Sequence, residues 1–551
     1  MTSPSGTIDP RPMDPGIAEM QAAADKIAAM DFPTSIGAFV AERAATLGNA
    51  PAAVWFEDGI TLSYAELHRR SDALAAALMA RGIRKGAHVA LMMPNVPEFV
   101  LSWFALAKLG AVLVPTNTAY TATELDYLLN QSDAQALITD ASLLPALEGM
   151  SKRPAVLDDA RVFVRGGGAP YVSLEAMLAE EREWSAPWPV VSTDLMSLQY
   201  TSGTTGFPKG CMLTHDYWLL LALSAAAGMG ADEVKTSLLW APFFYMDPQW
   251  QLLMTMQLGG TAYVARRMSL TRFFDWTRDL QINYTYFPEA ALKTLPPSDN
   301  DRKMSLRYIN AFGWSPASVR EAQERFGVIA RDSFGMTEIG AGMLVPVAAT
   351  HKLDKRTCGV DAPFRQTRVI GEDGRECAPG EAGELQVRGR SILSGYYKRP
   401  DANAESFDGE WFRTGDLFIA DEDGYLSIVG RIKDMVRRSS ENISAREVEA
   451  VLEELPEVEE AAVVPVPDPL RKEEVKAYLK LKPGVAREDF SLDALFEHCR
   501  KNLAAFKVPR YVAFIDDYPR TPSHKIAKPK LIAAAGDLRA DSFDRVDNIW
   551  R

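Results

Sequence analysis

Residues 201–210 read Thr201-Ser202-Gly203-Thr204-Thr205-Gly206-Phe207-Pro208-Lys209-Gly210, which concentrates hydroxyl groups, glycines and one lysine. Glycine lets the backbone fold into a concave nest of N–H donors, and the other side chains add hydroxyl donors and a positive charge. The run Leu195–Tyr200 before it predicts a strand, so the loop would leave the carboxyl end of a strand in an α/β sheet. The stretch predicts a phosphate-binding loop, with a turn-rich surface linker as the alternative.

The spacing in this loop differs from the Gly-x-x-x-x-Gly-Lys-Ser/Thr pattern of a Walker loop, so an ordinary NTPase is not indicated. The chain has 551 residues, enough for two or three domains, and 47% apolar with 24% charged residues is typical of a soluble protein. A net charge of −13 argues against a nucleic-acid partner. Because the acidic excess lies upstream of residue 431, a polyanionic substrate would need local basic groups.

The cysteines are scattered, without a Cys-x-x-Cys pair or the His/Cys spacing of a zinc site, so we expect a reducing compartment and a cytoplasmic protein. No basic start followed by an apolar run marks a signal peptide. The most lipophilic stretch, Trp218–Gly230, is shorter than the roughly 20 residues that span a bilayer. It predicts a buried helix under the loop rather than stable membrane insertion. The cysteines are Cys211, Cys358, Cys377 and Cys499.

Changes of pattern along the chain predict its organisation. Between about 35 and 300, strand-like runs alternate with helical patterns such as Tyr64–Ala80, which indicates parallel sheets covered by helices. From about 357 to 430, short strands punctuated by Gly, Pro and Asp indicate a β subdomain, and residues 431–551 read as a compact α+β module. We therefore expect an α/β fold with a large N-terminal body of doubly wound sheets, residues 1–430, and a small C-terminal domain.

A second cluster, Asp332-Ser333-Phe334-Gly335-Met336-Thr337-Glu338, follows the apolar run Val328–Ala330. A carboxylate beside a hydroxyl on a glycine turn can hold Mg²⁺ on a nucleotide phosphate, because Mg²⁺ takes oxygen ligands. The alternative is a helix start, since threonine is a good N-cap.

Three more stretches carry candidate ligands. In Trp411–Asp416 the aspartate can accept hydrogen bonds from ribose hydroxyls, although Thr-Gly-Asp is also a common turn. The fourth stretch is Gly430–Asp434, which contains Arg431 and Lys433. The fifth is Pro519–Lys525, whose lysine has a solvated surface charge as its alternative.

In this order and over residues 195–530, these motifs closely resemble the adenylate-forming superfamily, which includes acyl-CoA synthetases, firefly luciferase and the adenylation domains of peptide synthetases. The resemblance implies an ATP-dependent acid:CoA ligase. Such an enzyme makes acyl-AMP and pyrophosphate from a carboxylate and ATP, then acyl-CoA and AMP with CoA. The implied cofactors are ATP, Mg²⁺ and CoA.

The resemblance also implies a role for each motif. The loop would cradle the β- and γ-phosphates, Phe334 would stack on adenine in place of the usual tyrosine, and Asp416 with Arg431 would hold the ribose. Thr337 would contact the α-phosphate and the acyl carboxylate, while Glu338 and Thr204 would hold Mg²⁺. The nucleotide-binding residues so implied are Thr201, Ser202, Gly203, Thr204, Thr205, Gly206, Lys209, Asp332, Ser333, Phe334, Gly335, Met336, Asp416 and Arg431.

In the same resemblance, Lys525 would be the adenylation lysine and would act with Thr337 and Glu338 in catalysis. Lys433 would be the hinge of a mobile C-terminal domain, residues 431–551, that rotates to admit the thiol. We expect CoA rather than a carrier protein as the thiol donor, since no carrier domain is fused to these motifs.

Residues 435–444 look like a pantetheine-contacting strand, close in wording to carnitine- and crotonobetaine-CoA ligases. Ser440 stands where relatives usually carry glycine, and its side chain would crowd the pantetheine tunnel. A solvated strand face is the alternative for the two arginines. The implied CoA residues are Arg437, Arg438, Ser439 and Ser440.

Family pockets for the acyl group are lined by residues at Pro242–Tyr245 and Gly313–Pro316. Trp314 replaces a small residue and would shorten the channel, which favours a short, medium or aryl acid over a long-chain one. Aromatic residues with one carboxylate would also suit a carnitine-like betaine, with plain packing as the alternative. The pocket candidates are Tyr245, Asp247, Trp250, Gly313, Trp314 and Ser315.

Two other functions remain open at this point. One is an adenylation enzyme that loads a carrier protein or oxidises its adenylate as luciferase does. The other is a non-catalytic nucleotide-binding relative, against which Lys525 and Glu338 argue. The expected partners are small molecules, and a homodimer is compatible with the chain.

Overall fold

The computed structural model describes residues 13–180, 182–201, 208–229, 234–294, 296–438, 441–503, 505–521 and 525–551. Within these, the chain forms two compact units. The first holds residues 13–201, 208–367 and 387–411, and the second holds residues 368–386 and 412–551. The domain boundary at residue 430 and the hinge at Lys433 stay predictions.

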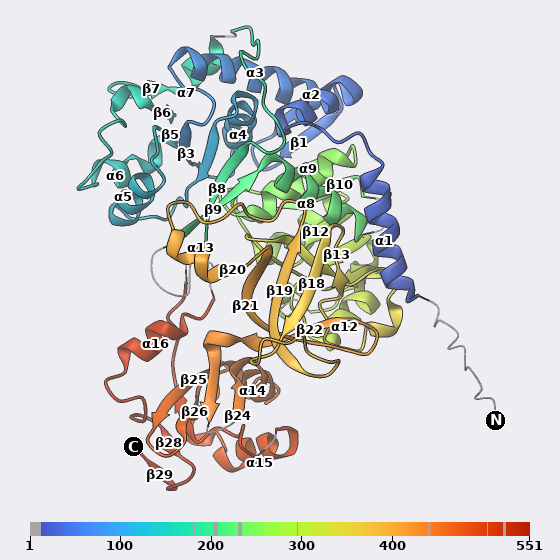
Figure 1. The fold of residues 1–551 in the computed structure, drawn as a ribbon, viewed down its shortest axis with the longest axis vertical. Coiled ribbons are helices and arrows are strands. Elements are labelled where there is room, and N and C mark those ends of the chain that lie inside the picture. Colours follow the sequence, from blue (N-terminus) through green and yellow to red (C-terminus); the bar gives the residue numbers. More distant parts are fainter. Residues whose placement is uncertain are drawn as a thin grey trace, which may run out of the picture. The chain divides into compact units, whose positions relative to one another are not determined.

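The first unit contains a mostly parallel sheet that ends in the strand pair on either side of the predicted phosphate loop (Figure 1). Parallel strands need crossover connections, and the chain supplies helices between them. In spatial order the strands are β7 (Val172–Ser173), β6 (Val162–Arg165), β5 (Ala136–Asp140), β3 (His88–Met92), β4 (Val112–Pro115), β8 (Leu195–Thr201) and β9 (Lys209–Thr214). Its helices are α3 (Tyr64–Ala80), α4 (Pro97–Leu109), α5 (Ala122–Gln131), α6 (Leu144–Glu148) and α7 (Leu174–Ala179).

A second sheet of the first unit is also mainly parallel, with one antiparallel strand at its edge. In spatial order its strands are β14 (Ile329–Arg331), β13 (Tyr308–Asn310), β12 (Tyr284–Tyr286), β10 (Thr236–Leu239), β11 (Thr261–Val264), β1 (Pro51–Trp55) and β2 (Ile60–Ser63). The other helices of this unit are α1 (Pro15–Ala28), α2 (Ile36–Leu47), α8 (His215–Ala227), α9 (Met246–Gln257), α10 (Leu270–Asp279), α11 (Glu289–Thr294), α12 (Pro316–Phe326) and α13 (Pro400–Ser406).

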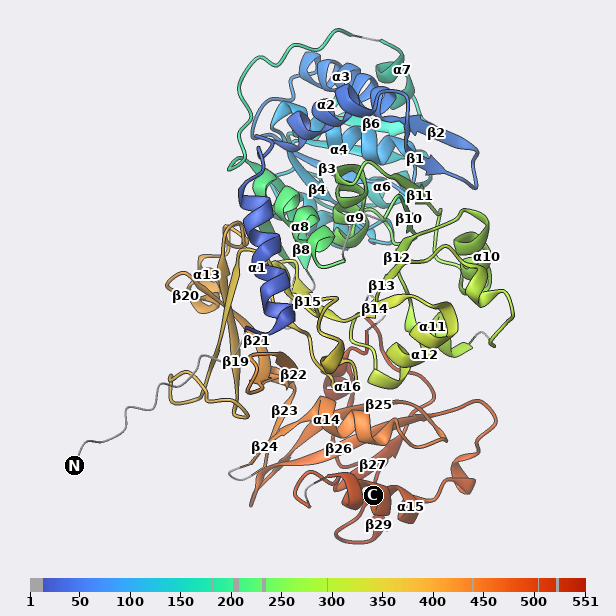
Figure 2. The same ribbon diagram turned by 90° about the vertical axis from the view of Figure 1, so that its right-hand side faces the viewer.

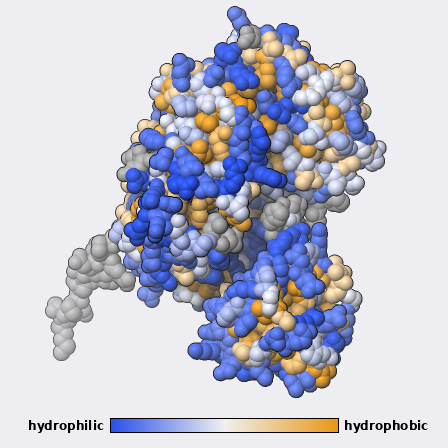
Figure 3. Space-filling view, turned by 180° about the vertical axis from the view of Figure 1, so that it is seen from behind, coloured by the Kyte–Doolittle hydropathy of each residue, from blue (hydrophilic) through white to orange (hydrophobic). Residues whose placement is uncertain are grey.

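Helices α8 and α9 lie between the two sheets, since α9 packs on β10 and β11 while α8 packs on α9 and β9 (Figures 1 and 2). Nearly every residue of α8 is buried, which explains its lipophilic sequence: it is a helix enclosed by protein on all sides. None of the described helices is long and apolar enough to cross a membrane. On the face shown in Figure 3, hydrophobic residues are interspersed with hydrophilic ones.

The region predicted as a β subdomain, residues 357–430, consists mainly of strands, but its residues are divided between the two units, so a separate subdomain stays a prediction. The strands are β17 (Val360–Asp361), β18 (Arg365–Ile370), β19 (Ala382–Gly389), β20 (Phe407–Asp408), β21 (Trp411–Ala420) and β22 (Leu426–Arg431). Before them, β15 (Ser333–Met336) and β16 (Gly340–Leu344) form a hairpin.

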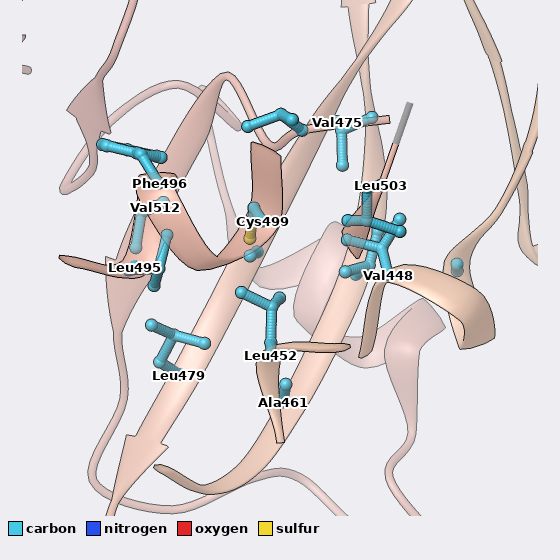
Figure 4. Close-up of a cluster of buried hydrophobic side chains, with 14 of the residues drawn as sticks. Val448, Leu452, Ala461, Val475, Leu479, Leu495, Phe496, Cys499, Leu503 and Val512 are labelled. Carbon is cyan, nitrogen blue, oxygen red and sulfur yellow. The ribbon is translucent and has the colours of Figure 1, made fainter. Parts of the chain in front are cut away.

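The C-terminal part of the second unit, from residue 435 onward, folds around its own core (Figure 4). Val448 and Leu452 of α14 meet Leu495 and Cys499 of α15 over the strands of a mixed sheet. The helices are α14 (Ala445–Leu452), α15 (Leu492–Asn502) and α16 (Lys528–Ala534), and the strands are β23 (Met435–Arg438), β24 (Glu441–Ser444), β25 (Val458–Asp468), β26 (Lys472–Leu481), β27 (Tyr511–Phe514), β28 (Phe543–Asp544) and β29 (Ile549–Trp550). The prediction of an α/β body with a separate α+β C-terminal part is confirmed.

Candidate active site

The predicted phosphate loop connects β8 to β9, which pair antiparallel with Thr201 opposite Lys209. The loop therefore follows the carboxyl end of β8, as expected. The Nζ atom of Lys209 lies 4.0 Å from the centre of the Tyr396 ring. The loop candidates Ser202, Gly203, Thr204, Thr205 and Gly206 lie outside the described residues.

The second cluster forms a hairpin rather than a helix start. Residues 333–336 are strand β15, and the chain turns at Thr337 and Glu338 into β16. The helix alternative is therefore wrong, because the threonine stands in a tight turn between paired strands. A Cβ atom at Gly335 would lie 2.5 Å from the carbonyl oxygen of Gly340, so this turn requires glycine there.

Buried tyrosines hold the two turn residues expected to act on substrate. The Tyr217 hydroxyl, from α8, donates to the carbonyl oxygen of Thr337 at 2.9 Å, and the Thr337 hydroxyl lies 3.4 Å from the sulfur of Met246 on α9. The Tyr396 hydroxyl donates to Oε1 of Glu338 at 2.8 Å, and both side chains are buried. The hairpin turn is thus anchored on α8, α9 and the segment that contains Tyr396.

Asp332 lies beside the predicted acyl-pocket turn. The backbone N–H groups of Gly313 and Ser333 donate to Oδ1 of Asp332 at 2.8 and 2.7 Å. Phe334 is buried. The Trp314 ring packs edge-on against Phe287, 5.7 Å between centres, in the hydrophobic core of the second sheet.

The start of α9 brings Asp247 to aromatic side chains. The Trp250 indole N–H donates to Oδ1 of Asp247 at 3.3 Å, and Tyr245 precedes the helix. Burial, with the negative charge of Asp247 as a smaller cause, raises the pKa of Tyr286 to about 12. Tyr286 stacks on Trp240 with ring centres 5.5 Å apart. Sequence reasoning missed Tyr286, which lies on β12, far from the recognised motifs.

In the second unit, Asp416 and Arg431 face each other across the antiparallel strands β21 and β22. Arg431 Nε donates to Oδ1 of Asp416 at 2.8 Å. Asp416 is only 1% exposed, and its Oδ2 atom is buried with no hydrogen-bond partner in the described part of the chain. The alternative of a simple turn at Thr-Gly-Asp is wrong, since Asp416 lies within a strand.

The pKa of Asp416 is raised by burial, while the charges of Arg431, Arg446 and Lys525 oppose that rise. Lys525 therefore lies within electrostatic range of a carboxylate that is 109 positions away in the chain. Its backbone closes a hairpin with Thr521, whose N–H donates to the Lys525 carbonyl at 2.8 Å. Arg520 anchors that hairpin on Glu460.

The predicted CoA strand is present as β23, but only part of it is described. The Arg437 side chain is exposed, whereas Arg438 donates to the buried carboxylate of Glu474 at 2.7 Å. Ser439 and Ser440 lie outside the described residues. So does the side chain of Lys433, whose backbone belongs to the short turn Ile432–Asp434.

A divalent cation fits Glu338 only with help from substrate. Among the described residues no group of three or more His, Cys, Asp or Glu side chains is arranged to hold a metal ion. Mg²⁺ commonly binds one or two carboxylates together with phosphate oxygens and waters. The donor set therefore suits a cation that arrives with a nucleotide.

The chain belongs to the AMP-binding enzyme family. The model of that family matches residues 40–397, and the model of the AMP-binding enzyme C-terminal domain matches residues 447–525. The resemblance drawn from the motifs is thereby confirmed.

Among its relatives, the putative acyl-CoA synthetase YngI of Bacillus subtilis is 34% identical over 538 residues, covering 90% of this chain and 96% of YngI. The crotonobetaine/carnitine–CoA ligase of Salmonella typhimurium is 32% identical, covering 85% of this chain and 92% of its own. The crystal structure of ATP-bound MatB from Rhodopseudomonas palustris has a TM-score of 0.81 at 26% identity, covering 91% of this chain and 99% of MatB.

Proposed function

We propose that this chain is an ATP-dependent acid:CoA ligase that activates a carboxylic acid as its adenylate. The observation that carries the proposal is the Asp416 carboxylate, which pairs with Arg431 and lies within electrostatic range of Lys525, and whose other oxygen is buried without a hydrogen-bond partner among the described residues. Such a carboxylate suits ribose hydroxyls, and the lysine suits charge that develops on a nearby phosphate. CoA as the acceptor is supported by the names of the relatives.

In the first half-reaction, an oxygen of the acid attacks the α-phosphorus of ATP, and the bond to pyrophosphate breaks. The barrier is mainly repulsion between anions. Lys525 would stabilise the developing charge, Thr337 would orient the acyl carboxylate and the phosphate, and Glu338 would hold Mg²⁺. When bound, Mg²⁺ supplies positive charge on the phosphate oxygens.

In the second half-reaction, the CoA thiolate attacks the acyl carbon, AMP leaves, and the thiol proton passes to solvent. Arg437 and Arg438 are the proposed pantetheine contacts, and Lys433 is the proposed hinge about which the C-terminal domain turns between the two steps. Because the cysteines are all free thiols, we also propose a cytoplasmic location.

A panel of carboxylic acids with ATP, Mg²⁺ and CoA tests the function. We expect acid-dependent pyrophosphate release, CoA-dependent AMP release and a thioester with short, medium or aryl acids. Pyrophosphate release without CoA-dependent AMP release would favour the carrier-protein or luciferase-like alternatives. Activity restricted to palmitate-length acids would contradict the proposed pocket.

A carnitine-like betaine is the sharper substrate proposal, supported by Asp247 with Trp250 and Tyr286 close by. A trimethylammonium acid and its neutral tert-butyl isostere have the same shape, so their kcat/KM ratio measures recognition of charge. We expect wild type to prefer the cation about tenfold, and Asp247→Asn to remove most of that preference. Equal kcat/KM values in wild type would contradict the betaine proposal while leaving the ligase assignment intact.

A further inference from the structure

Tyr396 lies between two oppositely charged residues of the nucleotide side of the site. Its hydroxyl donates to Oε1 of Glu338 at 2.8 Å, and its ring lies 4.0 Å from the Lys209 ammonium. Tyr396 is 3% exposed and Glu338 is 7% exposed, so water cannot replace the hydroxyl as a donor without rearrangement. One side chain thus contacts the lysine of the phosphate loop and the carboxylate expected to meet the metal.

The backbone fixes Tyr396 from two sides. On one side its segment pairs with β9: Met212 N–H donates to the Gly395 carbonyl at 2.9 Å, and Tyr397 N–H donates to the Gly210 carbonyl at 2.9 Å. On the other side, the Asn403 amide receives the Tyr396 N–H at 2.7 Å and donates to its carbonyl at 3.1 Å. The ring therefore has little freedom to leave the two charges.

The arrangement keeps the two charges separate. Among the ion pairs of the described residues, none joins Lys209 to Glu338, although both contact the same tyrosine. A direct pair would neutralise both groups, and phosphate and metal would then have to break it.

We propose that Tyr396 is a positioning residue that orients the Glu338 carboxylate toward a divalent cation and, with its ring, holds the Lys209 ammonium away from that carboxylate. The hydroxyl leaves the negative charge of Glu338 in place, because a neutral donor aligns a carboxylate without cancelling it. The ring face attracts the ammonium without taking up a carboxylate oxygen. This inference rests on the proposed nucleotide site.

Tyr396→Phe tests the hydroxyl alone, since the ring is retained. The readout is Mn²⁺ binding to the enzyme–ATP complex, followed by electron paramagnetic resonance without acid or CoA. Loss of a hydrogen bond to a ligating carboxylate typically weakens metal affinity about 10- to 100-fold, so we expect a loss of at least about tenfold. We also expect a matching rise in the Mg²⁺ concentration for half-maximal adenylation, with an unchanged KM for the acid.

Tyr397→Phe is the matched control. That neighbouring hydroxyl also donates to a carboxylate, Oδ2 of Asp133 at 2.7 Å, but at an exposed place away from the site. We expect wild-type Mn²⁺ affinity from it. Tyr396→Leu, which also removes the ring, should raise the KM for ATP about threefold beyond the Phe variant.

The outcomes separate this inference from the proposed function. If wild type binds Mn²⁺–ATP and Tyr396→Phe binds it equally well, with an unchanged melting temperature, the positioning role is wrong. If wild type itself fails to bind Mn²⁺–ATP, the proposed function is wrong. A fall in affinity of the same size in Tyr397→Phe would also overturn the inference, because the effect would then be general.

Discussion

Glu338 in the first unit and Asp416 in the second are both buried carboxylates expected to meet the nucleotide, yet their surroundings differ. Glu338 accepts a hydrogen bond from a neutral tyrosine hydroxyl. Asp416 accepts a hydrogen bond from the Arg431 guanidinium, and the positive charges of Arg446 and Lys525 also act on its carboxylate. The first carboxylate has a neutral partner, whereas the second has a cationic partner and, among the described residues, one oxygen without a hydrogen-bond partner.

This difference matches the chemistry of the two proposed ligands. A divalent cation binds best to a carboxylate whose charge is not already neutralised. A neutral hydrogen-bond donor orients such a carboxylate without cancelling its negative charge. Ribose hydroxyls need an acceptor rather than a net charge, so an arginine partner does no harm there. The type of hydrogen-bond partner thus distinguishes the carboxylate proposed to bind the metal ion from the carboxylate proposed to bind the ribose.

The largest effect is expected from Lys525→Ala, which removes one of the positive charges near Asp416. Loss of one preorganised charged group costs about 10²- to 10³-fold in rate, so adenylation should fall by that factor. Thioester formation from supplied acyl-adenylate should remain largely intact. Pyrophosphate exchange measures the first step, and thioester formation from the synthetic adenylate measures the second.

Lys530→Ala is the control for this variant, because Lys530 is an exposed lysine in the same unit. It should leave both steps unchanged. Equal loss of both steps in Lys525→Ala would contradict the assignment of this lysine to adenylation alone.

Lowering the pH should change the free energy of unfolding in opposite directions at two buried groups, His215 in the first unit and Asp416 in the second. His215, at the start of α8, is fully buried, and burial lowers its pKa from 6.5 to about 4. Between those values the unfolded chain binds a proton that the native one excludes. The stabilisation is therefore present above pH 6.5 and lost as pH falls toward 4, by about 3 kcal/mol in all. The raised pKa of Asp416 acts the other way.

Urea unfolding of the first unit, followed at several pH values between 7.5 and 4, measures this dependence. His215→Asn can still accept the hydrogen bond that Ile36 N–H donates to Nδ1 of His215 at 3.2 Å, and should flatten the profile. His351→Asn, at an exposed position, should leave the profile as in wild type. A wild-type slope in His215→Asn would exclude His215 as the cause.

Glu338→Gln removes the negative charge that we expect to bind the divalent cation, and it keeps the shape of the side chain. We expect Mn²⁺ affinity in the ATP complex to fall about 10²-fold, because a metal ligand matters at least as much as its hydrogen-bond partner. Glu324→Gln, at an exposed position on α12, is the control. Retained Mn²⁺ affinity in Glu338→Gln would mean that another group holds the cation.

The sequence predicted those parts of the site that local chemistry determines. The helical pattern over Tyr64–Ala80 predicted both ends of helix α3 correctly. A lipophilic run too short to cross a membrane predicted the buried helix α8. The sequence allowed two local structures at Thr337, a glycine turn and a helix start. Only the pairing of Ser333–Met336 with β16, a tertiary contact, decided between them.

Tyr217 and Tyr396 could not be found in this way. Their hydroxyls meet the site from positions 120 and 58 residues away in sequence, and neither tyrosine belongs to one of the motifs that the sequence analysis singled out. Gly395, with φ of +126°, marks an unusual backbone just before Tyr396, but a glycine alone does not name its neighbour's partner. Side chains that act through other side chains become visible only in three dimensions.

Asp416→Asn should have the smallest effect, and it tests the comparison most directly. Since the charge of Asp416 is already opposed by arginine, its removal should raise the KM for ATP only about tenfold, with the Mn²⁺ affinity of the ATP complex unchanged. The free energy of unfolding at neutral pH should not fall, because the raised pKa shows that ionised Asp416 is disfavoured in the native state.

A 2′,3′-dideoxy analogue of ATP supplies the control: wild type should discriminate against it, and Asp416→Asn should not. If discrimination survives in the variant, the ribose is held elsewhere; if Mn²⁺ affinity falls as far as in Glu338→Gln, the two carboxylates do not differ in the way their partners indicate.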